Sequence, residues 1–342
     1  MAALDTIKAI QIVDLTGPTS ALRLVDLPGP KSPPSHMFTP GEGVTIDVRA
    51  AGVSFPEVLQ SRGEYQYKPP LPFVPGAEVA GVVRETSGQA SDLGVSAGQR
   101  VAAFCMTGGF AEVTVAPAFL TFPLPEALDF AQGAGLILNY HTAYFALALR
   151  GRLQEGETVL VHGAAGGVGT AVLQVAAGLG ARTIAVVSSE EKALVARQAG
   201  ADEVLRSDGP WKDEAKELSS GGVDVVLDPV GGDRFTDSLR SLRPDGRLVV
   251  VGFTGGAIPE VKVNRLLLGN VEVVGAGWGA YALTRPELCR EIGARLQRLI
   301  EQGYVHPIVG GRFPLERAAD ALQEIDARRA TGKIVLDTRE GS

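Results

Sequence analysis

A cluster of small residues in the stretch VHGAAGGVGTAVLQVA, residues 161–176, joins a short apolar run to a helical pattern. Gly163, Gly166 and Gly169 give a close form of the G-x-G-x-x-G fingerprint; in its strict register Ala164 takes the first place. Such residues allow a tight turn, a close approach of the backbone to a pyrophosphate, and close packing of helix on strand. Close packing with no ligand is the competing interpretation. The N–H groups at the helix start would face the phosphates, and the expected contacts are Ala165, Gly166, Gly167 and Val168.

The next apolar run, residues 182–187, ends in Ser188 and Ser189, and Lys192 follows one helical turn later. A site for NAD would need an acid here, because a carboxylate binds the 2′-hydroxyl of the ribose. Hydroxyl groups and a cation suit an added 2′-phosphate instead. The two glutamates that follow match the dipole of a first helical turn, and either serine also suits a helix N-cap. The pattern therefore predicts NADPH as the cofactor.

Alternating strands and helices must position these residues. From residue 158 onward, charge-poor apolar runs alternate with helical patterns, which is typical of a parallel sheet covered on both faces. The part before residue 128 consists of short β-like runs separated by Gly and Pro clusters. The sequence predicts an α/β protein of two domains. Residues 1–128 together with 281–342 form a β-rich domain, and residues 129–280 form a doubly wound domain.

Composition restricts the class of partner. The 342 residues include 32 Lys and Arg against 39 Asp and Glu, and a net charge of −7 argues against a nucleic-acid partner. Cys105 and Cys289 alone cannot make a disulfide framework. The N-terminal residues lack a signal-peptide pattern, and the uncharged stretches 130–149 and 158–181 are interrupted by polar residues or glycines. We expect a cytoplasmic protein without a membrane partner.

Several longer stretches together resemble the medium-chain dehydrogenase/reductase superfamily and, within it, the zinc-free quinone oxidoreductase family. They cover nearly the whole chain: AAGVSFPEVLQSRGEY, PFVPGAEVAGVV, NYHTAYFAL, VLVHGAAGGVGTAVLQVA, DPVGGD, VVVGF and ATGKIVL. The resemblance implies that the β-rich domain is GroES-like and catalytic, and that the doubly wound domain is of the Rossmann type and binds NADPH.

The resemblance also implies further cofactor contacts, namely Asn139, Thr142, Asp228, Val230, Gly231, Gly252, Phe253, Thr254, Trp278 and Lys333. Other interpretations stay open. Thr142 also suits a bond within its own helix, residues 228–233 suit a simple strand-end turn, and Lys333 suits an exposed edge strand. Ser207 stands where the family often has a Tyr beside the 2′-phosphate, and whether Ser207 or its neighbour Arg206 makes that contact is open.

Zinc-dependent relatives carry a His where this chain has Ala77, and a catalytic Cys where it has Ser54. Because tetrahedral zinc needs three or four clustered ligands, no metal is predicted. The family's acceptor wall has an N-x-x-[DE]-x-Y-x-x-x-G-x-Y pattern, onto which this chain places Ser54, Glu57, Leu59, Gly63 and Tyr65. The Asn and the first Tyr are therefore lost, and of the two Tyr residues only Tyr65 is kept. We expect Ser54, Tyr65 and Trp278 to bind the acceptor.

The sequence thus predicts an NADPH:quinone oxidoreductase that transfers hydride to a quinone or another α,β-unsaturated carbonyl. No acid–base residue is essential, because water can protonate a hydroquinone anion; Tyr65 is the one candidate donor. An enoyl-thioester (acyl-CoA type) reductase and an NADPH-binding structural or sensor protein with weak turnover are the alternatives. The physiological acceptor, and whether one electron or two pass to it, stay open. The apolar run 271–277, whose one charge is Glu272, predicts an edge strand that pairs in a homodimer.

Overall fold

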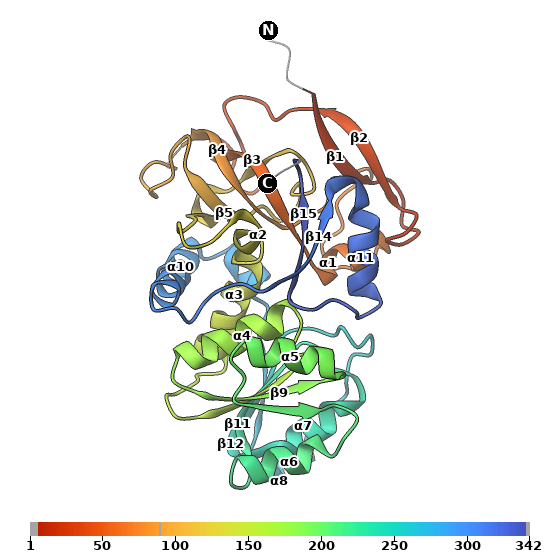
Figure 1. Cartoon of the computed structure of the whole chain (residues 1–342), viewed down its shortest axis with the longest axis vertical. Helices are drawn as coiled ribbons and strands as arrows, with labels where there is room; N and C mark the ends of the chain where they lie inside the picture. Colours follow the sequence, from red (N-terminus) through yellow and green to blue (C-terminus); the bar gives the residue numbers. More distant parts are fainter. Residues whose placement is uncertain (1–5, 89, 340–342) are drawn as a thin grey trace. The chain divides into compact units, whose positions relative to one another are not determined.

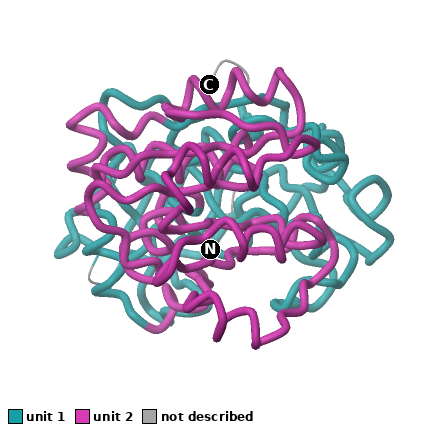
Figure 2. The backbone as a smooth tube through the Cα atoms, turned by 90° about the horizontal axis from the view of Figure 1, so that it is seen from below, with its two compact units in different colours: residues 1–138, 285–293, 307–342 teal, residues 139–284, 294–306 magenta. Residues whose placement is uncertain are grey.

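The computed structural model describes residues 6–88 and 90–339. Two units divide the chain (Figure 2): unit 1 comprises residues 1–138, 285–293 and 307–342, and unit 2 comprises residues 139–284 and 294–306. The expected boundary at residue 129 differs from this division. Residues 129–138 belong to unit 1, because helix α2 (Phe130–Gly133) packs on two strands of the unit 1 sheet, β3 (Gly43–Val53) and β4 (Glu78–Ser87).

Unit 2 is built on a six-stranded parallel sheet with the order β10-β9-β8-β11-β12-β13. The central strands are almost wholly buried, as expected of a parallel sheet with helices on both faces. The strands are β8 (Thr158–His162), β9 (Arg182–Val187), β10 (Glu203–Arg206), β11 (Val223–Asp228), β12 (Leu242–Val250) and β13 (Glu272–Gly275). The predicted doubly wound fold is confirmed, and the run 271–277 supplies the edge strand β13.

Helices α4 and α5 lie on one side of this sheet and α6 and α7 on the other (Figure 1). The chain runs from β8 outward through β9 to β10 and then crosses back to β11, beside β8. Ligands of such sheets bind where the strand order reverses, outside the carboxyl ends of the strands. The helices are α4 (Gly167–Gly178), α5 (Glu190–Gln198), α6 (Trp211–Leu218), α7 (Phe235–Ser241), α8 (Asn264–Gly269) and α9 (Trp278–Ala282), with the short η3 (Gly232–Arg234).

The stretch of residues 124–149 before β8 has the length and composition of a helical segment. It is divided into α2, α3 (Ile137–Tyr144) and the π-helix η2 (Phe145–Arg150). The chain leaves the helical path at Gly135, where an added Cβ would lie 3.0 Å from Cγ of Lys333. Residues 134–136 form a turn between α2 and α3, and the side chain of Lys333 packs against it.

Unit 1 contains a seven-stranded sheet with the order β14-β15-β3-β4-β5-β7, and β6 pairs with β3. The hairpin of β1 (Thr6–Ile12) and β2 (Leu22–Pro28) forms a separate small sheet. The other strands are β5 (Arg100–Phe104), β6 (Val113–Ala116), β7 (Thr121–Pro123), β14 (Val309–Pro314) and β15 (Lys333–Asp337). The helices are α1 (Phe55–Ser61), α10 (Pro286–Glu301, shared between the units), α11 (Ala318–Asp326), η1 (Ala118–Leu120) and η4 (Leu315–Arg317).

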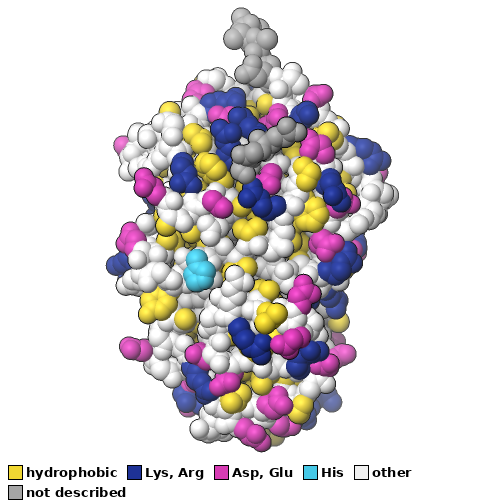
Figure 3. Space-filling view, viewed as in Figure 1, with side chains coloured by type: hydrophobic (Ala, Val, Ile, Leu, Met, Phe, Trp, Pro, Cys, Tyr) yellow, Lys and Arg dark blue, Asp and Glu magenta, His cyan; other side chains and the backbone are white. Residues whose placement is uncertain are grey.

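Charged side chains of both signs lie interspersed on the face drawn in Figure 3. Within residues 6–88 and 90–339, no helix has both the length and the apolar composition that a membrane crossing requires.

Candidate functional site

The turn between β8 and α4 is built on glycine. Gly163 has φ of +58°, and an added Cβ at Gly169 would lie 2.3 Å from the carbonyl oxygen of Gly163, so a larger residue cannot fit there. Gly166 is the N-cap of α4, and no side chain caps the helix. The nearest atom to an added Cβ at Gly166 is 3.5 Å away. Ala165, Gly166, Gly167 and Val168 therefore present an open helix N-terminus that suits an anion.

A second group follows β9 and β10. The ammonium of Lys192 lies 3.4 Å from the Ser188 hydroxyl, and the guanidinium of Arg206 donates to the Ser188 carbonyl oxygen at 3.0 Å. Ser207 is held beside them, because its N–H donates to the Val187 carbonyl at 2.8 Å. Ser189 caps α5 through its hydroxyl, as its N-cap interpretation predicted. The cations Lys192 and Arg206 therefore both lie at Ser188, where NAD would need an acid.

Hydrogen bonds connect the loop after β11 with the loop after β12. Oδ1 of Asp228 accepts from the N–H groups of Val230 and Gly231 at 2.8 and 2.9 Å. The N–H and hydroxyl of Thr254 both donate to the Pro229 carbonyl at 3.1 Å, which places Gly252 and Phe253 beside this turn. Oδ2 of Asp228 is buried and has no hydrogen-bond partner among the described residues, and burial raises the pKa of this carboxyl. An unpartnered buried carboxylate oxygen suits a hydroxyl donor such as a ribose.

Most of the expected cofactor contacts in unit 2 therefore follow the carboxyl ends of adjacent parallel strands. Asn139, Thr142 and Trp278 differ, because they are buried side chains of α3 and α9, 4%, 8% and 2% exposed. The Trp278 ring lies 5.3 Å from the His141 ring, measured between centroids. Their contact with a cofactor or acceptor remains a prediction.

The structure places Lys333 in the interior of unit 1. It is 3% exposed at the start of β15, which lies between β14 and β3, so the exposed edge-strand interpretation is wrong. Its ammonium forms a short ion pair with Glu78, which is fully buried, and donates to the Ser54 hydroxyl at 2.7 Å. The other carboxylate oxygen of Glu78 accepts from the Leu138 N–H at 2.8 Å.

Glu57 lies in the same cluster. Its two carboxylate oxygens accept from the N–H groups of Ala77 and Ser54 at 3.0 and 2.9 Å. Burial raises the pKa of Glu57 to about 7, and the positive charge of Lys333 opposes this rise. Burial, followed by the charge of Glu57, also raises the pKa of Tyr65.

The predicted site contacts included neither Glu57, although it occupies the acidic position of the family's acceptor-wall pattern, nor Glu78. Each left a local signal: Glu57 stands three residues after a potential N-cap, and Glu78 is an acid inside an apolar strand.

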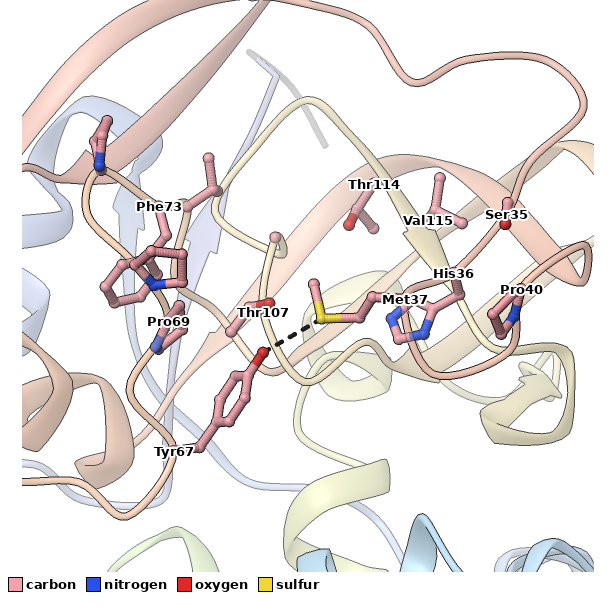
Figure 4. A pocket seen from close by; sticks show the side chains of 14 residues that line it. Ser35, His36, Met37, Pro40, Tyr67, Pro69, Phe73, Thr107, Thr114 and Val115 are labelled. Atoms are coloured by element: carbon pink, nitrogen blue, oxygen red, sulfur yellow. Dashed lines mark hydrogen bonds between the residues drawn. The ribbon is translucent and has the colours of Figure 1, made fainter.

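A hollow of about 730 Å³ lies elsewhere in unit 1 (Figure 4). Met37, Phe73 and four prolines give it apolar walls, and the Tyr67 hydroxyl lies 3.3 Å from the Met37 sulfur. His36, at its edge, lies 3.2 Å from the Cys105 carbonyl oxygen through Nε2, and burial lowers the pKa of its imidazole. The hollow therefore offers a neutral, mostly apolar surface.

Metal ligands are not gathered in the part of the chain that the structure describes. It contains no group of three or more His, Cys, Asp and Glu side chains that could hold a metal ion. His162 lies 2.8 Å from the Ser238 hydroxyl, and burial lowers its pKa to about 3.

Two family models match the chain, the alcohol dehydrogenase GroES-like domain over residues 40–126 and the zinc-binding dehydrogenase over residues 167–294. Mouse quinone oxidoreductase-like protein 2 is 41% identical over 299 residues, which are 86% of this chain and 85% of that protein. Rat quinone oxidoreductase is 35% identical over 337 residues, 96% and 97% of the two chains.

A solved mycobacterial structure complexed with NADPH is similar with a TM-score of 0.87 and 35% identity, covering 97% of this chain and all of that one. The similarity therefore extends over nearly the whole chain, both units included. The chain belongs to the quinone oxidoreductase family of the medium-chain dehydrogenase/reductase superfamily.

Proposed function

We propose that this protein is an NADPH-dependent reductase that transfers hydride to a quinone or another α,β-unsaturated carbonyl compound without a metal ion. The observation that carries the proposal is the group at the ends of β9 and β10. There, Lys192 and Arg206 meet at Ser188, in the place where an NAD site needs a carboxylate. The NADPH complex of the similar mycobacterial structure supports the same cofactor.

The residues present fit that cofactor. The uncapped N-terminus of α4 would hold the pyrophosphate, and the group around Ser188 would hold the 2′-phosphate. The unpartnered oxygen of Asp228 would accept from a ribose hydroxyl. NADPH, when bound, supplies the hydride, and the protein's task is to orient the acceptor and limit water.

The acceptor is proposed to contact Ser54, Tyr65 and Trp278. In zinc-dependent relatives a metal at this place acts as a Lewis acid toward the substrate oxygen. Ser54 and Ala77 are not metal ligands of that kind, so the acceptor must be one that takes hydride without a metal, which favours conjugated carbonyl compounds.

Oxidation of NADPH and NADH, followed by absorbance, tests this proposal with 1,4-benzoquinone, naphthoquinones, simple enones and crotonyl-CoA. We expect turnover of quinones or enones, faster with NADPH than with NADH. Turnover of crotonyl-CoA alone would identify an enoyl-thioester reductase. Tight NADPH binding in calorimetry without turnover of any acceptor would indicate a structural or sensor protein.

A further inference from the structure

The buried ammonium of Lys333 is held in a place prepared for it. An added Cβ at Gly52 would lie 2.6 Å from Cε of Lys333 and 2.8 Å from Cγ of Glu78, and one at Gly135 would lie 3.0 Å from Cγ of Lys333. Glycine at these two positions leaves the space through which the lysine side chain reaches its partners. Glu78 balances the charge in the interior, as a buried cation requires.

The contact of Lys333 with Ser54 fixes the direction of the serine hydroxyl. An ammonium has only donors, so the Ser54 oxygen must be the acceptor in the 2.7 Å bond. The proton of that hydroxyl therefore points elsewhere. The Ser54 oxygen also accepts from the Glu57 N–H in the capping box of α1, and no described residue accepts the proton of its hydroxyl. Ser54 is half-buried, so it is partly accessible to solvent.

The neighbouring carboxylate does not take up this proton. The two oxygens of Glu57 accept the backbone N–H groups of Ala77 and Ser54, and neither forms a hydrogen bond with the Ser54 hydroxyl among the described residues. The result is a hydroxyl that receives a bond from a fixed cation and has a donor to offer. A bond to a charged group polarises the acceptor and strengthens the bond that it donates in turn.

We propose that Ser54, held by Lys333, donates the hydrogen bond that stabilises the oxyanion formed on the acceptor's carbonyl oxygen. This inference rests on the proposed function and names the group that takes over the electrostatic role of a metal. The acceptor gains two electrons and one hydrogen with the hydride, the cofactor is oxidised, and negative charge develops on the acceptor oxygen. Solvent then supplies the proton that completes the reduction. Ser54 donates throughout and is not itself deprotonated.

Binding of 4-nitrophenolate in the presence of NADP⁺ tests this inference without turnover, because a phenolate mimics the hydroquinone anion. Ser54→Ala should weaken phenolate binding on the order of tenfold to a hundredfold, the usual effect of losing a hydrogen bond to a charged group. Binding of neutral 4-nitroanisole should stay the same. Ser54→Thr, which keeps the hydroxyl, should bind phenolate within a few-fold of the wild type. Ser96→Ala, at an exposed serine of the same unit, is the control.

The positioning role of Lys333 is tested by the double variant Lys333→Met with Glu78→Gln, which removes both charges of the buried ion pair together. In this double variant the affinity for 4-nitrophenolate should no longer exceed that for 4-nitroanisole. Adding Ser54→Ala to it should not weaken phenolate binding further. Turnover of enones should fall by roughly a hundredfold in Ser54→Ala, as for the loss of one oxyanion donor, and turnover of quinones should fall less because their charge is delocalised.

Equal phenolate affinity in the wild type and Ser54→Ala, or no phenolate binding to the wild type, would overturn the inference. Phenolate binding that depends on Ser54, in a protein that reduces no acceptor, would overturn the proposed function alone. If the protein reduces quinones but binds phenolate equally well with and without the Ser54 hydroxyl, the inference alone would be overturned.

Discussion

Replacement of Lys192 by Ala should weaken NADPH binding and leave NADH binding unchanged. The ammonium of Lys192 lies 3.4 Å from the Ser188 hydroxyl. A 2′-phosphate bound there would accept hydrogen bonds from both groups. A hydrogen bond to a charged group contributes about 1.5–3 kcal/mol, and the partly exposed position favours the lower end because solvent screens the charge. About 1.5 kcal/mol corresponds to roughly a tenfold rise in the dissociation constant for NADPH.

Arg206→Ala should have a smaller effect, because its guanidinium also pairs with Asp208 at 3.2 Å. The two cations share Ser188, so the double variant should not lose the simple sum of the two free energies. Calorimetric titration with NADPH and NADH measures each constant. Lys212→Ala, in the first turn of α6, removes the same charge from the same unit as a control. Equal loss of affinity for both cofactors in Lys192→Ala would refute the assignment of the 2′-phosphate site.

Three further outcomes are expected. Two chains should pair through the edge strand β13, so light scattering at micromolar concentration should show a dimer. The Val273→Lys variant should be a monomer. A monomeric wild type would contradict this prediction. Tyr65→Phe should lower the quinone turnover by less than about a hundredfold, and dialysis against EDTA should not change it; abolished turnover with NADPH binding intact would identify Tyr65 as an essential proton donor. Because burial raises the pKa of Glu57 from 4.5 to about 7, the folded state binds this proton more tightly, and the free energy of unfolding should fall as the pH rises between these values. Glu57→Gln should flatten that fall in urea titrations across the range, and an unchanged slope would be inconsistent with the raised pKa.

The fold of unit 2 could be predicted closely, because strand–helix alternation and glycine turns are local features. The helical pattern after the glycine turn is α4, and Ser189, one of the two serines that suited an N-cap, caps α5. Strand β10 and helix α6 were not predicted. Glu203 and Arg206 make β10 short and charged, and α6 follows it with mostly polar residues, so neither has a clear hydrophobic period.

By itself, the sequence determined the nucleotide-binding turn, the hydroxyl and cationic residues after the second strand, and the family. Within each of these motifs the residues lie a few positions apart, so their spacing in the sequence is enough to indicate the group that they bind. Only the tertiary structure decided the role of Lys333, which is 279 positions from Ser54 and 255 from Glu78. A lysine near the chain end has the same pattern whether it is exposed or buried. Its burial beside Glu78 follows from the pairing of β15 with β3 and of β3 with β4, and such long-range pairing leaves no trace in local periodicity.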